Sequence, residues 1–194
     1  MSWLHDQTRE LLQQVEDAKT HRVFPFFRPF ENVGPRVKIG NASYLSFTSN
    51  DYLGLSRDPR VTRRAAAALA AYGTGLGSAR PQATSDKHQL LERRLAEWLG
   101  YEDCAIFTTG YQGMVGILTA FCDDDTTVAL DKLSHACILD GAYLAQGQNP
   151  DLELRFFKHN SATSLRRILA QSDKPNKLVV CEGLYSVDGD MAPL

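Results

Sequence analysis

The spacing of apolar residues changes along the chain and divides it near residue 73. In the first part, apolar residues recur at helical spacing from residue 3 to 20, and the alanine-rich stretch from 58 to 72 has a high helix propensity. Between these two stretches, apolar and polar residues alternate from 36 to 48 around Gly40-Asn41, which is typical of a β-hairpin. The first part therefore predicts two helices and one hairpin.

The segment Val23–Phe30 combines phenylalanines with two prolines. Because proline lacks an N–H and restricts the residue before it, this segment predicts an extended aromatic arm rather than a helix. Such an arm suits packing across a subunit interface and equally suits burial on its own domain.

Beyond residue 73, helical and strand patterns alternate. The predicted helices span 86–99, 110–121, 135–145 and 164–171, and the predicted strands span 104–108, 127–130, 152–157 and 178–181. The helix at 86–99 carries its leucines on one side and is predicted to face the core. Alternation of this kind indicates an α/β fold with a mostly parallel sheet and helices on both faces. Ligands of such sheets bind beyond the carboxyl ends of the strands.

The amino-acid composition limits the kinds of partner that the protein is expected to bind. The 194 residues suffice for one sizeable domain, and 43% hydrophobic with 23% charged residues is ordinary for a soluble protein. The net charge of -2 gives no reason to expect a nucleic acid or an anionic membrane as partner, and no apolar run approaches the ~20 residues of a membrane span. No secretory pattern is present at the start, so a cytoplasmic location is expected. The four cysteines lack C-x-x-C spacing and are predicted to be buried thiols, with no disulfide and no metal site: Cys104, Cys122, Cys137 and Cys181.

Three short segments carry candidate chemistry at the ends of predicted strands. Thr109–Gly113 is a glycine-bracketed turn that opens a helix, where free N–H groups and the helix dipole favour a phosphate. Leu133–Ala136 brings an imidazole, and Cys181–Asp190 brings an acid and a serine. Together they indicate a pyridine cofactor that carries a phosphate. Each also has a plain structural interpretation: a tight turn, a satisfied histidine, a solvated acid and a turn-forming serine.

The residues that match a known pattern are Ser49–Leu55, Gly110-Tyr111, Ser134-His135-Ala136 and Glu182–Gly189. In this order they resemble the α-oxoamine synthases, which are pyridoxal-phosphate enzymes of the aspartate-aminotransferase fold (fold type I). The resemblance runs from the first helix to the last residue. It implies residues 1–57 as a helix, arm and hairpin, and residues 58–194 as the first part of the cofactor-binding large domain.

The resemblance also implies roles for individual residues. Gly110 and Tyr111 would hold the phosphate of pyridoxal 5'-phosphate, and His135 would stack on the pyridine ring, contact substrate and act in catalysis. Glu182 would lie near the ring substituents, and Ser186 would donate a hydrogen bond to the cofactor. Asn50 would approach the substrate carboxylate across a dimer interface, although a turn-forming role fits it too. The remaining histidines are interpreted as surface residues, and two aspartates of the third segment as turn residues: His5, His21, His88, His159, Asp188 and Asp190.

The implied activity is the decarboxylative condensation of an amino acid with an acyl thioester, acyl-CoA or acyl carrier protein, by a homodimer. The chain departs from the family pattern near Pro25, where an arginine is expected and only Arg22 or Arg28 is close, and after Gly75–Arg80, where a common glycine is missing. None of the seven lysines stands in the family's Schiff-base motif. We therefore expect the N-terminal half of a longer enzyme, inactive alone. A fold type I aminotransferase or C–C lyase, or a binding module without the lysine, are the alternatives.

Overall fold

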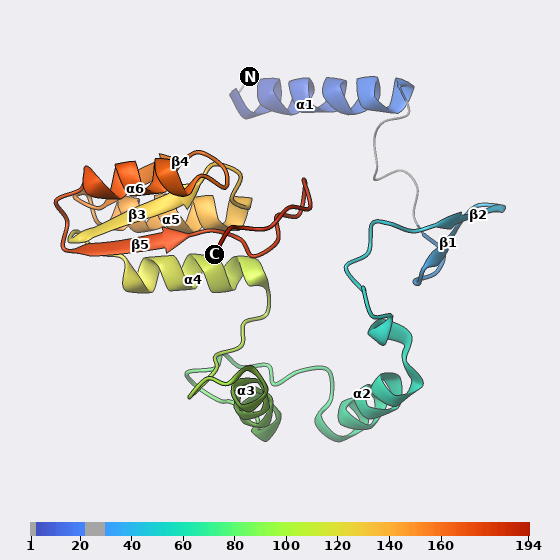
Figure 1. Cartoon of the computed structure of the whole chain (residues 1–194). Helices are drawn as coiled ribbons and strands as arrows, with labels where there is room; N and C mark the ends of the chain where they lie inside the picture. The colour runs from blue at the N-terminus through green and yellow to red at the C-terminus, as the bar shows by residue number, and fades with distance from the viewer. Residues whose placement is uncertain (1–2, 22–29) are drawn as a thin grey trace. The chain divides into compact units, whose positions relative to one another are not determined.

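The computed structural model describes residues 3–21 and 30–194, and the chain forms two compact units (Figure 1). The N-terminal unit is Met1–Ala83 and the C-terminal unit is Thr84–Leu194. The predicted arm at Val23–Phe30, together with Arg22 and Arg28, lies outside the described residues except for Phe30. The boundary predicted between residues 57 and 58 stays a prediction.

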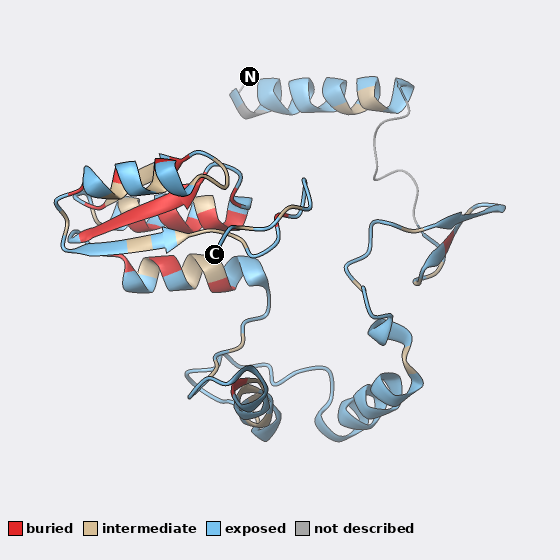
Figure 2. Cartoon of the chain, viewed as in Figure 1, coloured by how far each residue is buried: buried red, intermediate tan, exposed pale blue. Residues whose placement is uncertain are grey.

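Short elements make up the N-terminal unit, and their bounds agree with the predicted patterns. They are α1 (Trp3–Thr20), β1 (Arg36–Ile39), β2 (Ala42–Leu45), the 3-10 helix η2 (Leu55–Arg57) and α2 (Pro59–Tyr72). β1 and β2 pair antiparallel, and the chain reverses at Gly40, whose φ of 58° is a left-handed value that glycine adopts without strain. Among the described residues of this unit, Val37 alone is buried, as the blue colouring in Figure 2 shows.

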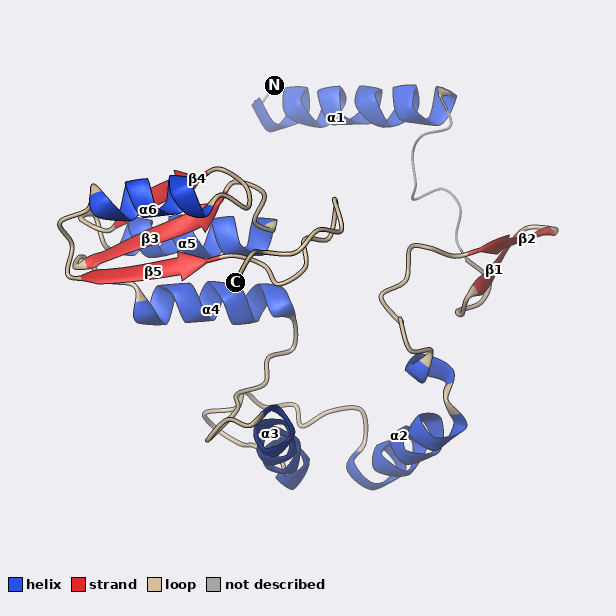
Figure 3. Cartoon of the chain, viewed as in Figure 1, coloured by secondary structure: helices blue, strands red, loops and turns tan. Residues whose placement is uncertain are grey.

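The C-terminal unit alternates helices and strands (Figure 3). Its elements are α3 (Asp86–Leu99), α4 (Gly110–Phe121), β3 (Thr126–Asp131), α5 (Ala136–Gln148), β4 (Glu153–Phe157), α6 (Ala162–Ala170) and β5 (Asn176–Val180). The three strands pair parallel in the order β4-β3-β5. The predicted α/β fold with a parallel sheet is therefore confirmed.

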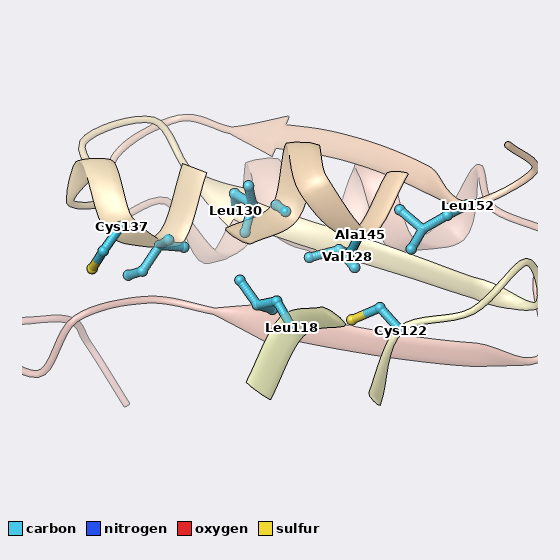
Figure 4. Close-up of a cluster of buried hydrophobic side chains, with 9 residues drawn as sticks. Leu118, Cys122, Val128, Leu130, Cys137, Ala145 and Leu152 are labelled. Atoms are coloured by element: carbon cyan, nitrogen blue, oxygen red, sulfur yellow. The ribbon is translucent and has the colours of Figure 1, made fainter. Parts of the chain in front are cut away.

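Helices cover both faces of this sheet, because β3 sends alternate side chains to opposite sides. Val128 and Leu130 pack with residues of α4 and α5, including Leu118 and Ala145 (Figure 4). Ala129, between them in sequence, packs on the other face with Phe157 and with Ile168 of α6. All six residues of β3 are buried, and they include the apolar run Val128–Leu130 and the polar residues Thr126, Thr127 and Asp131.

Two predicted features are wrong. Residues 104–108 form no strand, since the Cys104 N–H bonds the Asp103 carboxylate and the Ile106 N–H bonds Glu92, so these amides are not available to a ladder. Likewise, α3 does not face a core within the described residues: Ala96 is its one buried residue, and Trp98 is 79% exposed.

Candidate functional site

The carboxyl edge of the parallel sheet gathers the predicted polar residues of the C-terminal unit. β3 ends at Asp131 and leads into His135, while β5 ends at Val180 and leads into Glu182. Because neighbouring parallel strands end at the same edge, the two segments come together. The His135 N–H donates to Glu182 Oε1 at 2.5 Å, which joins two of the three predicted segments.

The N-terminus of α4 lies at this same end of the unit. Tyr111 donates its hydroxyl proton to Asp140 at 2.6 Å, and near the other end Asn149 Nδ2 donates to the Cys122 carbonyl at 3.2 Å. The two contacts come in the same order along both helices, so α4 and α5 run parallel. The start of α4 therefore lies beside the start of α5, which follows His135. The bond to Asp140 raises the pKa of the Tyr111 hydroxyl, which keeps it a donor.

Helix α4 offers free backbone donors at its start. The Thr109 hydroxyl caps the helix by accepting the Gln112 N–H at 3.1 Å. Within the described part of the chain, the N–H groups of Gly110 and Tyr111 have no hydrogen-bond partner. A Cβ built on Gly110 would meet nothing within 4 Å, so no protein atom crowds this side of the helix start. An anion fits this site.

His135 has a defined tautomer. It caps α5 through Nδ1, which accepts the Cys137 N–H at 3.1 Å and lies 3.0 Å from Cys137 Sγ. Burial, followed by the nearby Glu182 carboxylate, raises the pKa of the Cys137 thiol, so the thiol is also a donor toward Nδ1. Because Nδ1 accepts, the ring proton lies on Nε2. The exposed edge of His135 is therefore a donor.

His159, predicted to be a surface residue, is instead held in a network at this edge. Its Nδ1 lies 2.9 Å from Asp131 Oδ1 and its Nε2 lies 2.8 Å from Asp190 Oδ2. Asp131 is fully buried; burial opposes its ionisation, but bonds from the Leu133 and Asn160 N–H groups and from His159 outweigh burial and lower its pKa. The structural role predicted for Asp190 fits this network, and the sequence signal for His159 was its place directly after β4.

Buried polar atoms without partners lie around the same network. Ser134 Oγ, Asn160 Oδ1, Tyr185 OH and Asp190 Oδ1 make no hydrogen bond in the described part of the protein. Burial, with the Asp131 carboxylate adding to it, raises the pKa of Tyr185 to about 12, although the two side chains fall short of hydrogen-bond geometry. Polar atoms in this position indicate that the edge is built for further polar contacts.

Two predicted site residues are not tied into this arrangement. Ser186 is exposed in the turn that follows Tyr185. Asn50 belongs to the N-terminal unit, is exposed, and accepts the Tyr52 hydroxyl proton at 3.3 Å. It adjoins an open hollow of about 430 Å³ lined by residues that include Phe47, Asp51 and Tyr52.

Other classes of site receive no support from the described residues. No group of three or more His, Cys, Asp or Glu side chains is arranged to hold a metal ion in the ranges 3–21 and 30–194. In those same ranges, none of the helices has both the length and the apolar content that a membrane crossing requires. All four cysteines are free thiols. Cys122 and Cys137 are buried as predicted, whereas Cys104 and Cys181 are only half-buried, so the predicted burial is wrong for these two.

Comparisons with known proteins show what this chain is similar to. No family model matches the chain. The 8-amino-7-oxononanoate synthase of Yersinia pseudotuberculosis serotype O:1b is 38% identical over 195 residues, covering all of this chain and 49% of the relative. That of a Marinomonas species is 38% identical over 161 residues, covering 82% of this chain and 38% of the relative. The chain thus spans about half the length of the curated relatives it matches.

Solved structures give the same picture. Serine palmitoyltransferase of Sphingomonas wittichii superposes with a TM-score of 0.89 at 29% identity, covering all of this chain and 48% of that one. The 8-amino-7-oxononanoate synthase of Francisella tularensis superposes with a TM-score of 0.60 at 25% identity over 75% of this chain and 39% of that one. A serine palmitoyltransferase of S. paucimobilis, solved with a bound PLP–myriocin aldimine, superposes with a TM-score of 0.89 at 30% identity, covering all of this chain and 48% of that one. Sequence and fold together assign this chain to the α-oxoamine synthase family, whose members it matches over their N-terminal half.

Proposed function

We propose that this chain forms part of a pyridoxal-phosphate-dependent α-oxoamine synthase that condenses an amino acid with an acyl thioester and releases carbon dioxide. The observation that carries the proposal is the pair of free N–H groups at the start of α4, on the same edge as His135 and Glu182. The similarity to 8-amino-7-oxononanoate synthase and serine palmitoyltransferase supports the reaction class. By the same similarity, we propose a homodimer, with Asn50 near the substrate carboxylate.

The residues of this edge suit the parts of the cofactor. The Gly110 and Tyr111 N–H groups, at the positive end of the α4 dipole, would bind the phosphate. The exposed imidazole of His135 would stack on the ring, with Glu182 and Ser186 toward its substituents. When bound, pyridoxal phosphate supplies an electron sink that withdraws electrons from the amino acid. None of the seven lysines here is assigned to the cofactor.

His135 would position substrate as well. Its Nε2–H is a donor, since Nδ1 is occupied by Cys137, and a donor suits a substrate carboxylate or acyl carbonyl oxygen. Glu182 accepts the His135 N–H and so fixes the backbone that carries the ring. We also propose that the protein works in the cytoplasm, where its thiols stay reduced.

Gly110→Ala tests the phosphate site directly. A methyl group on Gly110 meets no protein atom within 4 Å, so the fold should be unchanged while the methyl group crowds a ligand bound at the start of α4. We expect the affinity of this chain for pyridoxal phosphate, measured by calorimetric titration, to fall at least about tenfold, or roughly 1.4 kcal/mol. Gly147→Ala is the matched control, because its Cβ is equally unhindered in α5, away from the site. Equal affinity in both variants would refute the phosphate site.

Substitution of His135 separates stacking from hydrogen bonding. His135→Phe keeps a flat ring and should retain most of the affinity for pyridoxal phosphate, whereas His135→Ala should lose much of it. In a chimera where this chain replaces the matched half of the Sphingomonas wittichii enzyme, both variants should slow thiol release from an acyl thioester by roughly 10²- to 10³-fold. Transfer of the amino group without thiol release would instead favour an aminotransferase.

A further inference from the structure

The protonation state of His159 follows from the geometry of its two contacts. Each ring nitrogen faces a carboxylate oxygen, Asp131 Oδ1 at 2.9 Å and Asp190 Oδ2 at 2.8 Å. Asp131 also accepts the Leu133 and Asn160 N–H groups, each at 2.9 Å, and Asp190 Oδ2 also accepts Asn160 Nδ2 at 2.7 Å. Both carboxyl groups therefore act as ionised acceptors. Since an imidazole can donate from both nitrogens only when doubly protonated, His159 is a cation.

The network ties a whole segment to the sheet. Asp190 ends the segment Cys181–Asp190, which is closed on itself by the bond from the Tyr185 N–H to the Asp190 carbonyl and from the Gly189 N–H to the Tyr185 carbonyl, both 2.9 Å. The Tyr185 ring meets the His159 ring edge-on, with centroids 4.5 Å apart. One end of the segment is thus held by His159, and the other end by the bond between Glu182 and His135.

The two carboxylates that contact His159 differ in how deeply they are buried. The titratable groups that face it are Asp131 from β3, and Asp190 and Tyr185 from the segment itself. Asp131 is fully buried, so leaving its carboxylate without a cation would be costly, whereas the Asp190 side chain is 43% exposed and, without His159, its Oδ2 still accepts Asn160 Nδ2. Loss of one proton from His159 therefore releases Asp190 rather than Asp131.

We propose that His159 is a positioning residue: as a cation between Asp131 and Asp190, it fixes the segment Cys181–Asp190 on the carboxyl edge of the sheet and so holds Glu182 and Ser186 in place. Only the link from these two residues to a cofactor rests on the proposed function. When His159 is neutral, the bond to Asp190 is lost and the segment loosens.

The first test is spectroscopic and needs no variant. Nitrogen-15 NMR of the imidazole ring at pH 7 should show both ring nitrogens of His159 protonated, while a histidine outside such a network, such as His5, provides the comparison in the same spectrum. A single protonated nitrogen at His159 would overturn the proposal. This readout reports the proton itself and does not depend on how stable the fold is.

The second test measures the order of the segment. Asp190→Ala should lower the hydrogen-exchange protection of the Tyr185 and Gly189 amides at least about tenfold, while β3 amides such as that of Leu130 keep theirs. Asp188→Ala is the matched control, because Asp188 is exposed in the same turn and outside the network. In the unsubstituted chain, protection of the same two amides should fall as His159 loses its proton. Unchanged protection in Asp190→Ala, or an equal loss in Asp188→Ala, would refute the proposal. Pyridoxal phosphate is absent throughout, so the result is independent of the phosphate site at Gly110.

Discussion

Helices in the two units of this chain begin with the same kind of side-chain cap but differ in how many of their residues are buried. α2 begins at an Asp58 cap that accepts the Arg60 N–H, and α4 begins at a Thr109 cap that accepts the Gln112 N–H. Yet α2 has no buried residue, while α4 buries Leu118 against the sheet and α5, and Gly113 beside Phe107. Caps and propensity determine where a helix starts and ends; burial requires partners distant in sequence.

The same contrast explains where the polar site residues can be held firmly. In the C-terminal unit, Asp131 ends the buried strand β3 and Glu182 follows β5, and they bond to residues 28 and 47 positions away, His159 and His135. In the described part of the N-terminal unit, the Asn50 side chain bonds to Tyr52 alone, two positions away. The polar residues of the sheet edge are therefore held by contacts distant in sequence within one unit, whereas the contact of Asn50 is local.

A leucine-to-alanine substitution in each unit should give the largest measured difference between the two units. Leu118→Ala removes a side chain that is 1% exposed at the centre of the core in Figure 4, and it should lower the free energy of unfolding by about 2–5 kcal/mol. Leu69→Ala removes a side chain that is 54% exposed on α2, and it should change that free energy by less than about 0.5 kcal/mol. Urea titrations followed by circular dichroism compare the two. Equal losses would mean that α2 is packed as firmly as α4.

The sequence predicts the features that are set by neighbouring residues and misses those that need a partner distant in sequence. The bounds of α1, α2 and α3 follow from periodicity, propensity and caps, which are local. The strand predicted at 104–108 failed because a strand exists only with a ladder partner, and here Glu92 takes the Ile106 N–H. For α3, the apolar side was evident, but nothing local determines whether another element covers Trp98.

The candidate site shows the same limit. His135 and Glu182 were predicted through family motifs, and the structure brings them together. His159 was missed because its partners, Asp131 and Asp190, are 28 and 31 positions away, and no spacing rule joins them. The tautomer of His135 depends on the N–H of Cys137, which becomes a donor toward it only when α5 forms.

The loss of stability at alkaline pH should be a property of the C-terminal unit. Bonds to Asp131 and then to Asp190 raise the pKa of His159, so its stabilisation is complete below the unfolded value of about 6.5 and is lost as pH rises through the folded pKa. The pKa of Asp131 is lowered overall, so its stabilisation is present above about 3.9 and is lost as pH falls through the folded value. Stability should therefore be highest between about pH 4 and 6.5.

Urea midpoints from pH 3 to 9 would measure both limbs of this profile. In His159→Gln the alkaline limb should disappear, because the residue that titrates is gone and glutamine stays neutral. His21→Gln, a change at an exposed residue of the N-terminal unit, should leave the profile unchanged. An alkaline limb that survives in His159→Gln would assign it to another group.

Removal of the helix caps should give the smallest effect and still distinguish the two units. Thr109→Ala and Asp58→Ala each delete a side chain that accepts an N–H in the first turn, a change that costs about 1 kcal/mol. α4 packs on the sheet, so Thr109→Ala should lower the unfolding midpoint of the core around Leu118. α2 has no buried residue, so Asp58→Ala should only increase fraying at the start of α2, seen as faster amide exchange there, and leave that midpoint unchanged. If Asp58→Ala lowers the midpoint as much as Thr109→Ala does, the helix of the N-terminal unit is coupled to the core, and the contrast between the two units does not hold.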